Sequence, residues 1–170
     1  MKKLLWLWVC MGCLSVWAQQ AGPATDQFVV TGRITKDTTF TLTSLLALES
    51  SPIPDLTITN HTGEPRGVAR GLRGVLVKDL LQSVRPDTDN PKLYSEYHYT
   101  FVAADGYKVV FSWNELFNSP TGDHVYLVVE KEGKMLGEMP GQILVITTTD
   151  FRTGRRHIKA LEKIVVGRAD

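Results

Sequence analysis

Cysteine is almost absent from this 170-residue chain, and its two copies, Cys10 and Cys13, both lie within the first 18 residues. The remainder therefore has no residue that could form a disulfide, a thiolate metal site or a cysteine nucleophile. An excess of charge of one sign is also lacking, because 19 Lys and Arg stand against 18 Asp and Glu. This balance argues against nucleic acid as the main partner.

Recognised catalytic signatures are missing as well. The chain contains no P-loop, no Rossmann glycine pattern and no nucleophile elbow. The spacings of its four histidines, His61, His98, His124 and His157, match no zinc motif. His61 could bind a ligand or a metal if the fold brings His98 or His157 near it; otherwise it is a polar loop residue.

Residues 1–18 have the pattern of a secretory signal peptide. Lys2 and Lys3 precede an apolar run, residues 4–16, that is short for a membrane span, and Ala18 is a small residue at the expected cleavage point. The alternatives are an uncleaved anchor and a lipoprotein acylated at Cys13. A lysine pair in place of twin arginines indicates Sec export. We expect a periplasmic or secreted protein without a membrane span after cleavage.

The remaining residues suit one domain. Residues 19–27, with Gly22 and Pro23, predict a flexible lead, and residues 28–168 a single domain. Loss of Lys2 and Lys3 leaves 17 of the 19 basic residues against 18 acidic ones, a net charge of −1.

Strand composition recurs along the domain and is interrupted by short helical patterns. The pattern predicts strands at 28–34, 56–59, 98–103, 107–111, 125–129, 143–147 and 158–166. It predicts short helices at 41–48, 75–84 and 114–118, with 160–162 as a helical alternative. Residues 60–74, rich in Gly and Arg, predict a long polar loop. The expected class is α+β, a strand-rich single domain with a few short helices.

Several segments then suggest a family. Residues 72–81 resemble the pattern "wrGv-x-l-x-dLL". Residues 104–107 and 111–116 resemble "DGY … fs-x-x-eL", a hairpin followed by a helix, and residues 157–164 resemble a closing "vKwl-x-x-I". In this order they resemble the oxidoreductase molybdopterin-binding domain, the catalytic module of sulfite oxidases and plant nitrate reductases. The resemblance implies a sulfite oxidase-like fold and makes molybdopterin a candidate cofactor.

The departures from the family concern the activity. In catalytic members a cysteine that follows the strand matching residues 56–59 binds molybdenum, and residues 60–73 hold no cysteine here. A Sec substrate also crosses the membrane unfolded and would leave an inserted cofactor behind. The resemblance therefore implies the fold more than the redox chemistry.

Basic residues provide the candidate binding groups. Arg66, Arg70 and Arg73 accompany glycines, and guanidinium groups bind phosphate in a bidentate way, so this segment could hold the phosphate of a pterin. The alternative is a solvated basic loop. Arg155 and Lys159 belong to a second basic group; the resemblance puts Lys159 near the pterin, and the alternative is an exposed hairpin tip and strand side.

Four further candidates follow from position. Asn60 and His61 lie beside the missing cysteine, and the resemblance turns Asp105 and Tyr107 toward the pocket, although Asp-Gly is also favoured in tight turns.

Three hypotheses remain open. The first is a domain that binds a pterin or another anionic small molecule without molybdenum redox catalysis. The second is a molybdopterin-dependent enzyme without protein thiolate, with His61 or Asn60 near the metal. The third is a domain with a closed pocket that interacts with a periplasmic protein partner.

Overall fold

The computed structural model describes residues 24–169, so the predicted signal peptide and residues 19–23 of the predicted lead lie outside the described residues. Strands dominate, and the α-helices are short: α1 (Leu42–Leu46), α2 (Val77–Leu80) and α3 (Trp113–Phe117). Four 3-10 helices accompany them: η1 (Leu81–Ser83), η2 (Pro91–Glu96), η3 (Pro120–His124) and η4 (Thr153–Arg156). The predicted α+β class, strand-rich with a few short helices, is confirmed.

The larger sheet has the strand order β2-β1-β12-β7-β8. Its strands are β1 (Gln27–Gly32), β2 (Thr38–Thr41), β7 (Tyr97–Ala103), β8 (Lys108–Ser112) and β12 (Leu161–Arg168). β1 runs parallel to β12, with Val29 opposite Lys163, and the other pairs are antiparallel. Alternate residues such as Tyr99 and Phe101 are fully buried, because successive side chains of a strand point to opposite faces.

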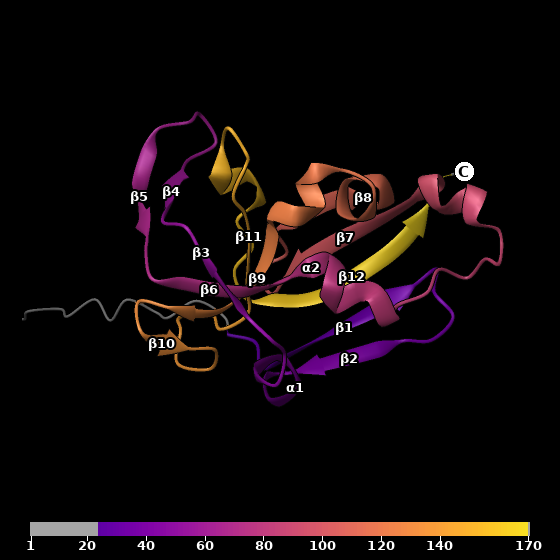
Figure 1. Ribbon diagram of the computed structural model, residues 1–170, viewed down its shortest axis with the longest axis horizontal. Helices are drawn as coiled ribbons and strands as arrows, with labels where there is room; N and C mark the ends of the chain where they lie inside the picture. The colour runs from indigo at the N-terminus through magenta and orange to yellow at the C-terminus, as the bar shows by residue number, and fades with distance from the viewer. Residues whose placement is uncertain (1–23, 170) are drawn as a thin grey trace, which may run out of the picture.

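The second sheet is built around β9 (Val125–Lys131), which pairs with three strands. The others are β3 (Ser51–Ile53), β6 (Leu72–Leu76), β10 (Lys134–Met135) and β11 (Leu144–Thr147). The prediction of a buried central strand at residues 125–129 is confirmed. A separate hairpin of β4 (Leu56–Thr59) and β5 (Pro65–Ala69) stands at one end of the molecule beside β11 (Figure 1).

Two of the short helices begin where the sequence places a cap. Thr41 accepts a hydrogen bond from the Ser44 backbone and caps α1, as expected from its hydroxyl. Ser112 and Glu115 form a reciprocal capping box at α3, which positions the Glu115 carboxylate for a contact described below.

The prediction of a long polar loop at residues 60–74 is wrong. Only the turn near residues 60–64 and the link at residues 70–71 are irregular, and the rest forms β5 and β6. Gly74, which suggested a loop, is instead required inside the sheet, since a Cβ there would lie 2.7 Å from the Leu127 carbonyl oxygen. The glycine content therefore reflects close strand packing at this position.

The boundaries that differ from the prediction include those of the second helix and of the last strand. Residues 75–76 belong to β6, so helical structure begins only at Val77 and continues as η1. The last strand begins at Leu161, because Ala160 has a positive φ of 51° and Ile158 forms only an isolated bridge to Val145. The helical alternative at residues 160–162 is wrong, because Leu161 pairs with Ala103 of β7.

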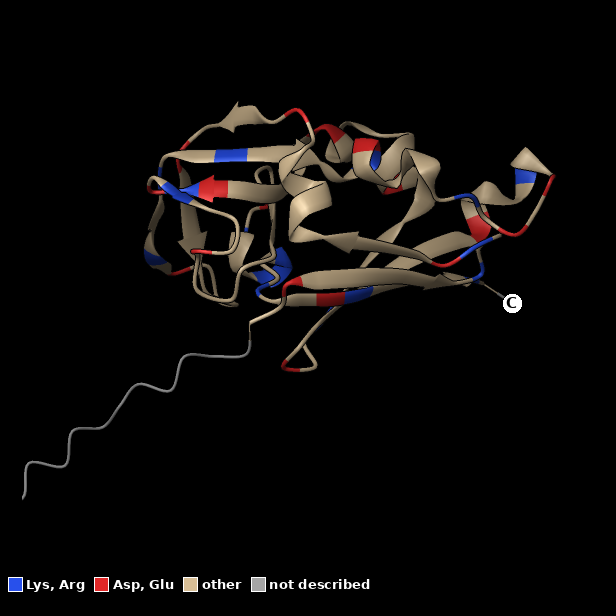
Figure 2. Ribbon diagram, turned by 90° about the horizontal axis from the view of Figure 1, so that it is seen from below, with Lys and Arg blue, Asp and Glu red and all other residues tan. Residues whose placement is uncertain are grey.

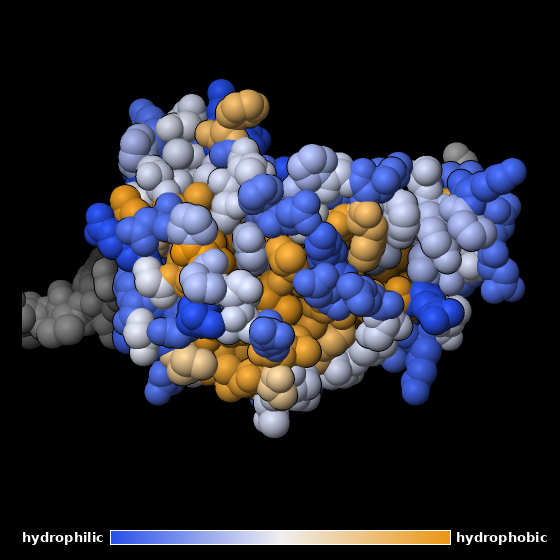
Figure 3. Space-filling view, in the orientation of Figure 1, coloured by the Kyte–Doolittle hydropathy of each residue, from blue (hydrophilic) through white to orange (hydrophobic). Residues whose placement is uncertain are grey.

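A single hydrophobic core cluster joins both sheets. Charged residues of both signs are scattered over the ribbon in Figure 2 and form no face of one sign. Figure 3 shows apolar side chains in the middle of one face, surrounded by polar ones. In the part of the chain that the structure describes, no helix is long and apolar enough to cross a membrane.

Candidate functional site

A pocket of about 330 Å³ opens where the turn after β4, the β7–β8 turn and η4 come together. Its lining residues are His61, Ala103, Asp105, Tyr107, Gly154, His157 and Lys159. They come from segments almost a hundred positions apart in the chain, so only the fold brings them together.

The β7–β8 turn supplies one side of the pocket. The Asp105 carboxylate accepts a hydrogen bond from the Tyr107 backbone N–H at 2.9 Å, and Gly106 has a φ of 86° that suits glycine. The Tyr107 hydroxyl donates to the Arg155 carbonyl oxygen at 2.6 Å. This bond fastens the turn to η4 and fixes the tyrosine ring at the pocket wall.

The turn after β4 supplies the opposite side. The Asn60 side-chain oxygen accepts hydrogen bonds from the backbone N–H groups of Thr62, Gly63 and Glu64, at 3.0, 2.9 and 2.9 Å. Its side-chain amide donates to the Glu64 carboxylate at 2.8 Å. Asn60 therefore shapes the turn, and its polar atoms are already engaged there.

Two arginines hold His61 in place through its backbone. Arg152 Nη1 and Arg155 Nη2 each donate to the His61 carbonyl oxygen at 3.2 Å. The imidazole itself is exposed and lines the pocket. The site therefore combines a histidine side chain with a basic rim.

The segment η4 is anchored against β4 by Thr153 and Gly154. The buried Thr153 hydroxyl donates to the Thr57 carbonyl at 2.7 Å and accepts from the Thr59 N–H at 3.0 Å. A Cβ at Gly154 would lie 1.9 Å from the Thr59 carbonyl oxygen, so only glycine permits this approach. The pocket floor thus depends on a glycine that packs against a strand.

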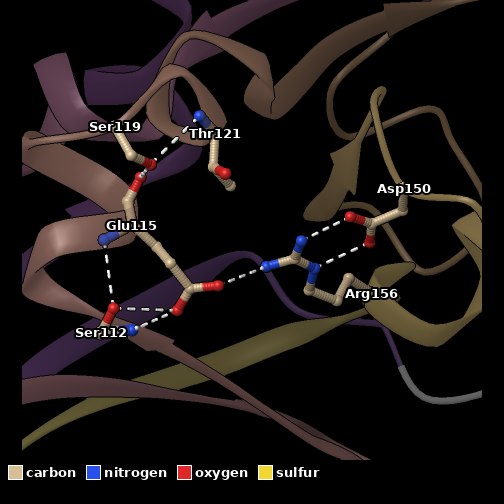
Figure 4. Close-up of polar contacts among 6 residues, drawn as sticks. All are labelled: Ser112, Glu115, Ser119, Thr121, Asp150 and Arg156. Carbon is tan, nitrogen blue, oxygen red and sulfur yellow. Dashed lines mark hydrogen bonds and ion pairs between the residues drawn. The ribbon is translucent and has the colours of Figure 1, made fainter.

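Arg156 ties the other side of η4 to α3 (Figure 4). Its guanidinium pairs with both carboxylate oxygens of Asp150, one at 2.7 Å, and with the Glu115 carboxylate at 3.1 Å. It also lies 4.7 Å above the centre of the Phe111 ring. Asp150 and Glu115 raise the Arg156 pKa.

His157 is half-buried at the pocket. Burial first, and then the charges of Lys159 and Lys131, lower the His157 pKa to about 4. At neutral pH the site therefore offers a neutral imidazole beside the exposed Lys159 ammonium group, which makes it a mixed hydrogen-bonding and cationic site.

The fold is shared with part of a sulfane dehydrogenase. The chain superimposes on the sulfane dehydrogenase SoxCD from Paracoccus pantotrophus with a TM-score of 0.61 and 14% sequence identity, over 82% of this chain. It spans 37% of that SoxCD chain, so most of the larger protein has no counterpart here. No protein-family model matches the sequence, and no curated protein matches it.

The likeness to SoxCD establishes the fold only. The positions of the predicted site residues are those seen in the structure of this chain. His61, Asp105, Tyr107 and Lys159 line the pocket, and Arg155 borders it through its two hydrogen bonds. Of the two histidines that could lie near His61, His157 does so, because both line this pocket. His98 packs against Gly167 instead.

The three arginines of the glycine-rich segment do not line this pocket. Arg66 is exposed on β5, Arg70 pairs with Asp55 at 3.4 Å on the surface, and Arg73 donates to the Ser50 carbonyl at 2.7 Å. The structure therefore does not bring the three arginines together into one anion-binding site.

Sequence reasoning named His157 only as a possible neighbour of His61, and it did not name Gly154 as a pocket residue. The isolated histidine had no motif spacing, and nothing local indicates that its neighbours bury it. The role of Gly154 depends on its close contact with β4, which only the fold reveals.

The residues present can be compared with the cofactor that the family resemblance implies. The pocket offers ammonium, imidazole and phenol groups, which fit an anionic or heterocyclic ligand, together with the Asp105 carboxylate, which accepts from the Tyr107 N–H. It offers no thiolate, because residues 19–170 contain no cysteine, and no group of three or more His, Cys, Asp or Glu side chains among residues 24–169 could hold a metal ion. A molybdenum centre held by protein thiolate does not fit these residues.

Proposed function

We propose that this chain is an exported domain of sulfite oxidase-like, molybdopterin-binding type that binds a pterin or a similar anionic small molecule without ordinary molybdenum redox catalysis. Its pattern of segments resembles that family, and its fold is that of part of an oxidoreductase, a sulfane dehydrogenase. Export rests on the signal pattern of residues 1–18.

The observation that carries this proposal is the pocket of about 330 Å³ in which His61, Asp105, Tyr107 and Lys159 meet. Lys159 would attract the anionic group, while the neutral His157 and the Tyr107 ring would contact a heterocycle. A cationic side chain and a planar wall suit a phosphate-bearing pterin. Arg152 and Arg155 add positive charge at the rim.

A binding experiment with matched variants tests the proposal. We expect a pterin monophosphate, titrated calorimetrically, to bind the exported protein, and Lys159→Ala to weaken binding about tenfold through loss of a charge-assisted contact. Arg70→Ala removes the same charge outside the pocket and should leave binding within about twofold of the wild-type value. Equal losses in both variants, or no binding, would contradict the proposal.

A second function is favoured by one observation. His61 and His157 line the same pocket, and a neutral imidazole is a common metal ligand. The chain would then be a molybdopterin-dependent enzyme that lacks protein thiolate. Stoichiometric molybdenum with pterin in protein purified from a cofactor-producing host would support this function over simple binding.

A further inference from the structure

A second pocket, of about 290 Å³, shares no residue with the first and lies between η1, η2 and α3 over β7. About half of its wall is apolar. The aromatic residues are Tyr94, Tyr99, Trp113 and Phe117, with Leu81 and Val84 beside them.

The four aromatic rings form a continuous chain. Tyr94 and Trp113 have ring centres 5.3 Å apart, Trp113 and Phe117 5.5 Å, and Tyr99 and Phe117 5.8 Å. The interplanar angles are 42°, 33° and 58°, so the rings are tilted relative to one another. Walls of this kind accept a flat aromatic ring, which gains both apolar burial and favourable ring contacts.

One polar atom in this wall has no partner. Tyr99 is fully buried, and its hydroxyl makes no hydrogen bond among residues 24–169. Two positions earlier on β7, the buried Tyr97 hydroxyl donates to Asp87 at 2.6 Å. A buried hydroxyl without a partner costs about 1–3 kcal/mol, so a ligand atom that moves the covering side chains aside and bonds to Tyr99 would recover stability. Burial raises the Tyr99 pKa, which keeps the hydroxyl protonated and able to donate.

The pocket also has a cation at its edge. Arg85 lines it, is exposed, and forms no ion pair within the described part of the chain. Arg33, whose backbone contacts the same segment, is paired with Asp87 at 3.1 Å. No acidic residue is among the described residues that line the pocket. The unpaired guanidinium therefore favours a carboxylate over a cationic ligand.

We propose that this pocket binds a small aromatic carboxylate whose ring carries a polar atom. The ring lies against Trp113 and Phe117, the carboxylate faces Arg85, and the ring's polar atom accepts from the Tyr99 hydroxyl. This inference does not depend on the proposed function, because the two pockets have no lining residue in common.

Three related probes test each feature of the proposed ligand. Calorimetric titration of the purified protein compares 4-hydroxyphenylacetate with phenylacetate, which lacks the ring hydroxyl, and with 4-hydroxyphenylacetamide, which lacks the charge. We expect 4-hydroxyphenylacetate to bind best, with each of the other two weaker by about fivefold, the value of one hydrogen bond of ordinary strength.

Two variants assign the preferences to residues. Tyr99→Phe should remove the preference for the ring hydroxyl and keep that for the carboxylate, and Arg85→Gln should do the reverse. Tyr99→Phe deletes an unsatisfied group, so we expect an unliganded protein at least as stable as the wild type. Should it fail to fold, the exposed Arg85 still tests the carboxylate preference by itself.

The contradicting outcomes are equally specific. Equal affinity for the three probes, or preferences that persist in both variants, would overturn the proposal. The absence of binding at probe concentrations up to about 10 mM would also overturn the proposal, because a dissociation constant above this value is too weak for a specific site.

Discussion

Replacement of Arg156 by Ala should be among the most damaging single changes outside the hydrophobic core. The side chain is only 23% exposed and its main partner Asp150 only 13%, so the pair is largely shielded from water. The substitution leaves the Asp150 carboxylate without its cation, removes a contact to Glu115 and uncovers the face of Phe111. Breaking a buried pair costs about 3–5 kcal/mol, and the partial exposure reduces this to about 2–3 kcal/mol.

Urea denaturation followed by far-ultraviolet circular dichroism measures this loss. With a slope of about 1–3 kcal/mol per M, the midpoint should fall by roughly 1–2 M. Arg155→Ala is the matched control, because this exposed neighbour contributes one side-chain hydrogen bond, to the His61 carbonyl, and its loss should cost less than about 1 kcal/mol.

A double variant examines the mechanism of the loss. Asp150→Ala combined with Arg156→Ala removes the abandoned carboxylate and should recover part of the stability lost in Arg156→Ala. A free energy of unfolding for Arg156→Ala within about 0.5 kcal/mol of the wild-type value would refute this mechanism. So would a loss in Arg155→Ala of the same size.

Two further predictions concern the first pocket. The His157 pKa is about 4 in the folded protein and near 6.5 in the unfolded chain, so the unfolded chain binds more protons between these two pH values. The free energy of unfolding should therefore be highest above pH 6.5 and should fall on acidification toward pH 4, by no more than about 3 kcal/mol. Denaturation midpoints across that range would check this, and a His157→Gln variant with an unchanged pH dependence would contradict it. Gly154→Ala should cost more than about 2 kcal/mol through collision with the Thr59 carbonyl, and a melting temperature equal to that of the wild type would disprove the close approach.

The features that the sequence predicted correctly depend on neighbouring residues. Asp105-Gly106 closes the β7–β8 hairpin through contacts within the turn, and the Ser112 to Glu115 capping box spans only three positions. Such signals need no knowledge of the rest of the fold. The order of these local elements was also sufficient to suggest the fold that the comparison with SoxCD supports.

The features that were missed depend on distant contacts. Gly74 fits beside Leu127, which lies 53 positions later, so its glycine resembled a loop residue in the sequence. The neutral state of His157 arises from burial that no local pattern reports. For the same reason the partners of the arginines at residues 66–73 could not be assigned, since strand pairing decides which carbonyl or carboxylate each one reaches.

The parallel pair of β1 and β12 has a consequence for when this domain can fold. Val29 pairs with Lys163, and β12 lies in the middle of its sheet, between β1 and β7. β1 therefore lacks its neighbour β12 until residues 161–168 have been synthesised. Contacts of such long sequence separation slow folding, because a large loop must close before they form. A chain arranged in this way stays unfolded while it is being synthesised, which is the condition that the proposed export in the unfolded state would require.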